Sequence, residues 1–236
     1  MNMTVLSLIQ GFTGEYGLPI PTGVIGSTDK AVVQYRSMLA WVTRRLCGYN
    51  LQQQNIRITW TSIAAEDQGA LSTLMPGFSS MSPGTLWDET EQWPVFGPLA
   101  DVSWEALQAF ANTGPLYQYK IASDHILVNP AMPSGHTLAC TYRTSYGWIT
   151  AAGVAEASPS ADNSTTLFPD DLMLVGLERR WKEIKGEPWA DTESDWVGLI
   201  SSAKMSDGGM PTLSLSGGNQ TARPGIYVPA GNWIVP

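Results

Sequence analysis

The chain contains little histidine, little cysteine and little charge. Its 236 residues include two histidines and two cysteines, and 14% of them are charged, against about 25% in an average soluble domain. Cys47 and Cys140 are too few and too far apart in the sequence for a disulfide framework or a zinc site. We interpret both as buried free thiols. The low charge content indicates that part of the surface meets other protein.

Long apolar runs are also missing. No stretch of about 18 apolar residues is present, and no basic and apolar leader precedes a cleavage site. We therefore expect no membrane segment, and a protein that is kept in a cytoplasm or in a particle assembled there. The 21 acidic and 13 basic residues give a formal net charge of −8. A surface of this sign does not favour binding to phosphates, which argues against a DNA-binding regulator.

The spacings of common catalytic and metal sites are absent as well. His125 and His136 do not form a His-x3-His pair, and no cysteine pair or spaced carboxylate accompanies them. No Gly-x-Ser-x-Gly elbow and no Walker-type phosphate loop occurs. We therefore expect no metal and no cofactor.

One acidic cluster is the best argument for an enzyme. Asp88, Glu89 and Glu91 lie beside Trp87 and Trp93, and paired carboxylates between aromatic platforms are typical of glycoside hydrolases. Neighbouring carboxylates in a Pro/Gly-rich loop usually point in different directions and are solvated. We therefore predict that the chain is not an enzyme.

The strongest helical pattern lies in residues 168–200. Pro169 suits the first helical position, and Asp170 and Asp171 place negative charge in the first turn. Apolar residues then recur on one side of this helix: Leu174, Leu177, Trp181 and Ile184. Gly186 ends the helix and Pro188 starts another, so we predict a helical hairpin.

Two further helices are expected near the amino terminus, over residues 4–16 and 29–47, with Ser27 or Thr28 as the cap of the second. Arg36, Arg44 and Arg45 lie off the apolar stripe of the second helix, where they form either a solvated face or a partner contact. In the predicted hairpin, Glu183, Glu187 and Asp191 are expected either to line a channel or to form an outward solvated face.

The pattern changes to a β-type period from residue 56. Residues 56–60 alternate, and several later segments are rich in β-branched and aromatic residues. Residues 102–110 fit a short helix, and residues 130–135 are expected to connect the two strands of a hairpin. The predicted fold class is α+β: a helical bundle built from both sequence ends, with an antiparallel β-rich insert and an extended C-terminal arm. The expected boundaries are 1–50 and 168–205 for the helical body, 51–167 for the insert and 206–236 for the arm.

The predicted arm combines flexible joints with apolar clusters. Gly, Ser and Pro residues separate two short apolar groups. These groups are Ile226, Tyr227 and Val228, followed by Trp233, Ile234 and Val235. Such a composition is typical of a segment that docks into grooves or adds a strand to another sheet.

The hairpin resembles a helix–Gly–helix segment of the head-to-tail adaptor (connector) proteins of tailed bacteriophages. The matching residues are Pro169, Asp170, Asp171, Leu172, Gly176, Leu177, Arg180, Trp181, Lys182, Gly186 and Trp189. Glu178 departs from the large apolar residue that is usual at its position. Three other segments occur in the family's order: GEYGLPIPTGVIGSTDKAVVQYRSMLAWV, GTLWDETEQWPVFGPL and TYRTSYGWI. The resemblance covers roughly residues 4–205.

The resemblance implies a structural virion protein that forms a closed ring, twelve-fold in that family, between the portal of a DNA-filled head and the tail. The partners would be the portal protein, further copies of the chain, and a tail tube, hub or second adaptor on the tail side. Double-stranded DNA would pass through the lumen without specific binding, and the ring would help to retain and channel the genome. The ring would lie at the head–tail neck of a virion assembled in the bacterial cytoplasm. The arm would then bind the portal or a neighbouring subunit.

A carbohydrate- or receptor-binding β-module of a virion is the alternative. It is motivated by Trp87, Trp93, Trp104 and Trp148 in the predicted insert. Aromatic platforms bind sugars, whereas the commoner role of a buried tryptophan is core packing.

Overall fold

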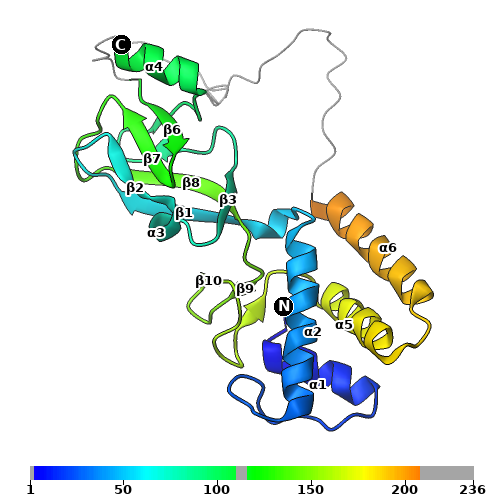
Figure 1. Cartoon of the computed structure of the whole chain (residues 1–236). Coiled ribbons are helices and arrows are strands. Elements are labelled where there is room, and N and C mark those ends of the chain that lie inside the picture. Colours follow the sequence, from blue (N-terminus) through cyan, green and yellow to red (C-terminus); the bar gives the residue numbers. More distant parts are fainter. Residues whose placement is uncertain (1–2, 110–115, 208–236) are drawn as a thin grey trace, which may run out of the picture.

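The computed structural model describes residues 3–109 and 116–207 (Figure 1). This part of the chain is α+β, with six α-helices and three antiparallel sheets. The helices are α1 (Val5–Glu15), α2 (Lys30–Cys47), α3 (Leu71–Leu74), α4 (Asp101–Ala109), α5 (Asp170–Lys185) and α6 (Ala190–Asp207). A single 3-10 turn, η1 (Gln52–Gln54), leads from α2 into the first strand.

Local side-chain chemistry sets several of the helix ends. Thr4 caps α1 by accepting a hydrogen bond from the backbone N–H of Ser7 at 3.2 Å. Asp29, not Ser27 or Thr28, caps α2 by accepting from the N–H of Ala31 at 2.8 Å. Gly186 ends α5 with a left-handed φ of 73°, which a glycine adopts without steric cost.

The strands are short and lie mostly between η1 and α5. They are β1 (Asn55–Thr61), β2 (Asp67–Ala70), β3 (Phe78–Met81), β4 (Trp87–Asp88), β5 (Trp93–Pro94), β6 (Gln118–Ala122), β7 (His125–Asn129), β8 (Thr137–Thr144), β9 (Trp148–Ile149), β10 (Ala155–Glu156) and β11 (Thr165–Thr166). The largest sheet has the order β1-β8-β4-β5, and β3 also pairs with β8. The other two sheets have the orders β2-β7-β6 and β10-β9-β11.

The predicted hairpin across residues 130–135 is wrong. These residues join β7 to β8, which lie in different sheets. Both edges of β7 are already paired, with β2 and with β6, so β8 has no edge to join there. The hairpin of this region is β6–β7 instead, and it turns through Ser123 (φ 49°) and Asp124 (φ 65°). Two successive left-handed residues are typical of the tight turns that match strand twist.

The described residues form two apolar cores. The first lies among α1, α2, α5 and α6, with Phe12, Leu39, Leu177 and Trp196 among its buried members. The second lies among α3, the strands of the five-stranded sheet and the strands of the β2-β7-β6 sheet. Its buried members are Leu71, Met75, Leu86, Val95, Tyr119, Ile126, Val128, Met132, Leu138, Cys140 and Tyr142. In Figure 1 the helices of the first core lie at one end of the molecule, and the five-stranded sheet and the β2-β7-β6 sheet lie at the other.

The prediction of a helical bundle built from both sequence ends is wrong. Two of the six helices, α3 and α4, lie in the middle of the chain, and the helices near the two ends share their core with a sheet. Trp148 of β9 is buried in the same cluster as these helices. The β10-β9-β11 sheet also contacts the start of α1. Thr4 forms a β-bridge with Thr165, and the N–H of Val5 donates to the carbonyl of Ser164 at 2.9 Å. The prediction of a bundle was wrong because helical periodicity shows which side of a helix is apolar, but not whether a helix or a sheet packs against that side.

The first two residues of the predicted arm belong to a helix. Helix α6 continues through Ser206 to Asp207. The rest of the predicted arm, residues 208–236, lies outside the described residues.

Candidate functional site

The α5–α6 hairpin holds its two helices together at one close approach. The indole Nε1–H of Trp196 donates to the carbonyl oxygen of Leu172 at 3.0 Å. Gly176 lies beneath this contact, and a Cβ on it would lie 2.7 Å from Cγ1 of Val42 and 3.1 Å from Nε1 of Trp196. A residue larger than glycine would therefore force α2, α5 and α6 apart.

The other hairpin residues of the family resemblance occupy ordinary structural positions. Leu172, Leu177 and Trp181 are buried in the first core. Pro169 is the N-cap residue of α5, and the prediction that it is the first helical residue is wrong, because the helix begins at Asp170. Asp170 accepts a hydrogen bond from the backbone N–H of Met3 at 2.6 Å, while Asp171 faces solvent. Trp189 lies between the helices and is 38% exposed.

One residue of the predicted apolar stripe is at the surface instead. Ile184 was expected on the buried side of α5, next to Trp181, but it is 44% exposed. It lies within two residues of Gly186, where α5 ends. The stripe therefore extends beyond the neighbours that could cover it.

Glu178, the departure from the family pattern, lies in a polar network. Its carboxylate accepts a hydrogen bond from Nζ of Lys182 at 2.6 Å, and this bond is the main cause of the raised pKa of that lysine. Glu178 also contributes to the raised pKa of the Tyr16 phenol, after desolvation by burial. The polar partners of this carboxylate are thus Lys182 on α5 and Tyr16, the residue that follows α1.

Arg179 is buried among aromatic rings. Its guanidinium carbon lies 4.8 Å from the ring centre of Trp41, 5.0 Å from that of Trp189 and 5.6 Å from that of Trp196. Glu183 and Glu193 pair with the same guanidinium. The planar cation thus joins α2, α5 and α6 through cation–π contacts and ion pairs. From its place in the sequence, Arg179 was predicted only to be a cation in the later turns of a helix, because the three tryptophans that surround it come from other parts of the chain.

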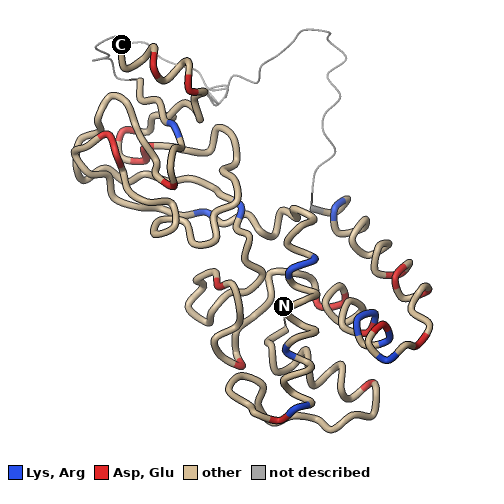
Figure 2. Tube along the Cα trace, viewed as in Figure 1, with Lys and Arg blue, Asp and Glu red and all other residues tan. Residues whose placement is uncertain are grey.

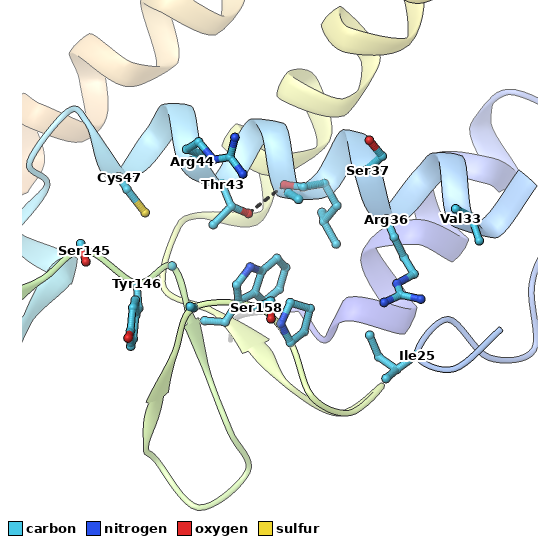
Figure 3. Close-up of a pocket in the computed structure, with 16 residues that line it drawn as sticks. Ile25, Val33, Arg36, Ser37, Thr43, Arg44, Cys47, Ser145, Tyr146 and Ser158 are labelled. Atoms are coloured by element: carbon cyan, nitrogen blue, oxygen red, sulfur yellow. Dashed lines mark hydrogen bonds between the residues drawn. The ribbon is translucent and has the colours of Figure 1, made fainter. Parts of the chain in front are cut away.

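A groove of about 650 Å³ lies on the side of α2 that faces β9 and β10 (Figure 3). Its lining includes Ile25, Val33, Ala40 and Trp148, and two cationic side chains, Arg36 and Arg44. In Figure 3, Arg36 extends from α2 toward Ile25, and Tyr146 and Ser158 lie across the groove from the helix. We call this feature the basic groove.

Two polar side chains in the lining of the basic groove, Thr43 and Cys47, are not poised to react with or bind a ligand. The hydroxyl of Thr43 donates to the backbone carbonyl of Leu39 at 2.9 Å, so its proton is used within α2. Burial raises the pKa of the Cys47 thiol to about 11. A protonated thiol is a poor nucleophile and a poor metal ligand.

The helix that forms one wall of the groove has an unusual charge pattern for an acidic protein. Helix α2 carries four cations and no carboxylate. They are Lys30, Arg36, Arg44 and Arg45, all exposed, and none forms an ion pair within the described part of the chain. Figure 2 shows basic positions along α2, both signs on α5, and acidic positions along α6. The groove is therefore a local positive surface.

The predicted acidic cluster does not converge. Asp88 is buried, and its Oδ2 lies 2.6 Å from Nδ1 of His136. Glu89 pairs with Arg57, and Glu91 is exposed. The expectation that these loop carboxylates are all solvated is wrong for Asp88, whose partner lies 48 residues away in sequence.

Ser62 lies close to the Asp88–His136 pair without completing a catalytic relay. Its hydroxyl donates to the carbonyl of Pro133 at 2.6 Å and accepts from the backbone N–H of His136 at 3.0 Å. The hydroxyl of Ser62 therefore donates its proton to a backbone carbonyl and not to the imidazole of His136. Asp88, His136 and Ser62 together fasten the segment before β8 to β4 and β1. His125 instead pairs with Asp67 at the surface.

The four tryptophans of the sugar-binding alternative do not form one platform. Trp104 and Trp148 are buried, and Trp148 belongs to the first core. Trp87 is half-buried and its Nε1 donates to the carbonyl of Gly84 at 3.3 Å. Trp93, on β5, is 44% exposed.

Residues 3–109 and 116–207 contain no group of three or more histidine, cysteine, aspartate or glutamate side chains placed to hold a metal ion. The helices of the same residues include none with the length and apolar character that a membrane span requires. Six predicted anchor residues of the arm lie outside the described residues: Ile226, Tyr227, Val228, Trp233, Ile234 and Val235.

A scan against protein-family models and a search of curated proteins both find no match for this chain.

Proposed function

We propose that this chain is a structural virion protein of a tailed bacteriophage: the adaptor that forms a ring between the portal of the DNA-filled head and the tail. The protein acts by binding, without catalysis and without a cofactor. Its partners are the portal protein, further copies of itself and a tail-side component such as a tail tube, a hub or a second adaptor. The ring assembles in the bacterial cytoplasm and lies at the head–tail neck.

The observation that carries this proposal is the α5–α6 hairpin. Several of the residues that resemble the adaptor family hold the hairpin together: Gly176 lies at the closest helix contact, Leu177 and Trp181 are buried, and Gly186 forms the left-handed stop. The residues that carry the resemblance therefore include those on which the packing of this hairpin depends.

The polar clusters support a binding role over catalysis. The carboxylates and histidines that could have formed a site pair with one another as Asp88–His136 and Asp67–His125, and the hydroxyl nearest the first pair is used by the backbone. The surface instead offers an apolar groove with unpaired cations. Such features are typical of protein-binding surfaces.

The overall charge suits a channel through which DNA passes. A net charge of −8 for each copy keeps phosphates from binding tightly to the ring. The ring then retains and channels the genome without specific contacts to it. In this proposal the arm of residues 208–236 reaches the portal or a neighbouring copy, with its two apolar clusters as anchors.

Assembly with the portal tests the proposal. Purified alone at low concentration, the chain should be monomeric or mixed in size, because free subunits lose translational freedom when they associate. After addition of the portal protein encoded by the same genome, mass photometry should show one complex of defined mass. A monomer that ignores the portal at every concentration but binds defined sugars on a glycan array would support the β-module alternative and overturn this proposal.

A further inference from the structure

We propose that two surfaces on opposite sides of the helical end join neighbouring copies head to tail. The basic groove of one copy receives the acidic face of the next, which we define as the exposed residues of the α5–α6 hairpin around its turn and the start of α6. This inference rests on the proposed function, because the contact that it names is the one that would close the proposed ring.

The first surface is the basic groove. Its walls are apolar, and Arg36 and Arg44 lie eight residues apart on α2, which corresponds to about 12 Å along the helix axis. Neither guanidinium has a carboxylate partner within residues 3–109 and 116–207. Val33, next to them, is an exposed apolar residue. The groove thus presents apolar surface together with positive charge that no residue of the same described chain neutralises.

The second surface has the opposite charge and the same mixed character. Its carboxylates are Glu187, Asp191 and Asp195, all exposed and without an ion pair in the described ranges, and they outnumber the one exposed cation at the turn, Lys185. Exposed apolar side chains lie at the same turn: Ile184 and Trp189, 44% and 38% exposed. Asp191 and Asp195 are four residues apart on α6, so they project from the same face of the helix. This is the acidic face.

The two surfaces lie on different sides of the helical end. In Figure 1, β9 and β10, which border the basic groove, lie on one side of α2, and α5 and α6 lie on the other. A contact between unlike surfaces on opposite sides of one body cannot be satisfied by a two-fold pair that uses one patch. It repeats from copy to copy and closes into a ring when the rotation between copies is fixed.

A second copy fits the groove better than nucleic acid or a small ligand. Nucleic acid requires a broad basic surface, whereas this protein carries a net charge of −8 and the groove walls are mostly apolar. A small-ligand site usually has several buried polar groups that point inward. Here the Thr43 hydroxyl is used within its helix and the two arginines are exposed. A mixed apolar and acidic surface, such as the acidic face, complements this lining.

The test exchanges the charges of the two surfaces. One variant carries Arg36→Glu and Arg44→Glu, and the other carries Asp191→Arg and Asp195→Arg. Each variant alone meets like charges at the contact, so its ring population with the portal protein should fall at least tenfold in native mass spectrometry. An equimolar mixture should restore the ring with the two variants in equal numbers, because each variant's altered surface then faces its complement.

A matched control separates this contact from a general charge effect. Lys30→Glu with Arg45→Glu makes the same charge change on the same helix, at exposed positions that do not line the groove. This control should assemble as the wild type does. Normal rings from the groove variant alone overturn the inference, and so does failure of the mixture when both variants keep the wild-type melting temperature.

The same experiment distinguishes this inference from the proposed function. If wild type and both variants all form portal-bound rings, the adaptor function stands and the head-to-tail contact is wrong. If wild type never binds the portal but self-associates at high concentration, and only the mixture of variants reproduces that association, the contact stands and the adaptor function is wrong.

Discussion

The indole N–H of Trp196 donates to the carbonyl oxygen of Leu172, 24 residues earlier in the chain, across a distance of 3.0 Å. This hydrogen bond fastens the middle of α6 to the first turn of α5. It is buried, so neither group can replace its partner with bulk water. The hairpin that resembles the adaptor family is therefore held by a polar contact within an apolar core.

Trp196→Phe removes this hydrogen bond and keeps an aromatic ring. We expect the free energy of unfolding to fall by about 1–2 kcal/mol, and by about 3–5 kcal/mol for Trp196→Ala, which also leaves a cavity. Urea denaturation followed by circular dichroism measures both changes. Equal stability of the wild type and Trp196→Phe would show that the contact contributes nothing.

Gly176→Ala should destabilise the chain although alanine is the better helix former. The new methyl group would lie 2.7 Å from Val42, so the free energy of unfolding should fall by about 1–3 kcal/mol. Gly198→Ala is the matched control, because nothing lies within 4 Å of its added Cβ. That control should raise stability by about 0.5–1 kcal/mol. A rise for both variants would contradict the close packing at Gly176.

The two thiols should react slowly in the native protein. Burial raises the pKa of Cys47 to about 11 and that of Cys140 to about 12. At pH 8 the reactive thiolate is then scarcer, on the order of a hundredfold or more, than for an ordinary cysteine with a pKa of about 8.5. Labelling with dithionitrobenzoate should be slow in buffer and should reach two thiols per chain in urea. The expectation of a buried thiol is confirmed for Cys140 only, because Cys47 is partly exposed in the lining of the groove. Fast native labelling of Cys140 would contradict its burial, and fast labelling of Cys47 would contradict its raised pKa.

Alkaline pH should weaken the second core. Cys140 has its pKa raised in the folded state, so its contribution to stability is complete below the unfolded pKa and is lost as pH rises toward about 12. From an unfolded pKa of about 8.5, the loss is about 2 kcal/mol at pH 10. Cys140→Val removes the titrating group. The difference in unfolding free energy between pH 8 and pH 10 should shrink by that amount in the variant, and an unchanged difference would contradict the assignment.

Deletion of residues 208–236 separates the arm from the two cores. The arm's Gly-, Ser- and Pro-rich composition is typical of a segment that docks on another surface, so the melting temperature should stay within a few degrees of the wild type. Attachment to the portal should be lost, because the arm's apolar clusters are the proposed anchors. A truncated chain that melts much lower and still binds portals would place the arm in the protein's own core.

Some helix ends were predictable because local chemistry determines them, although the cap of α2 is Asp29 and not Ser27 or Thr28. Gly186 stops α5 through its own left-handed backbone, and Asp170 and Asp171 lie in the first turn as expected. Strand partners were not predictable in the same way. Residues 130–135 carry the signals of a hairpin turn, but the pairing of β7 with β2 and β6 depends on segments far away in the sequence.

The candidate surfaces were only partly visible in the sequence. The charges of Arg36 and Arg44 and their place off the apolar stripe were evident, and so was the choice between a solvated face and a partner contact. The groove itself was not, because its second wall comes from Tyr146 and Ser158, more than a hundred positions later. The burial of Arg179 was missed for the same reason, since its aromatic neighbours lie on three different segments.

Electron microscopy of the chain mixed with the portal protein tests the central claim most directly. Views along the axis should show a closed ring of this chain, with the symmetry of twelve seen in the family it resembles, stacked coaxially on the portal and leaving an open channel. Portal particles that carry no added ring at saturating concentrations of a folded, full-length chain would contradict the adaptor function.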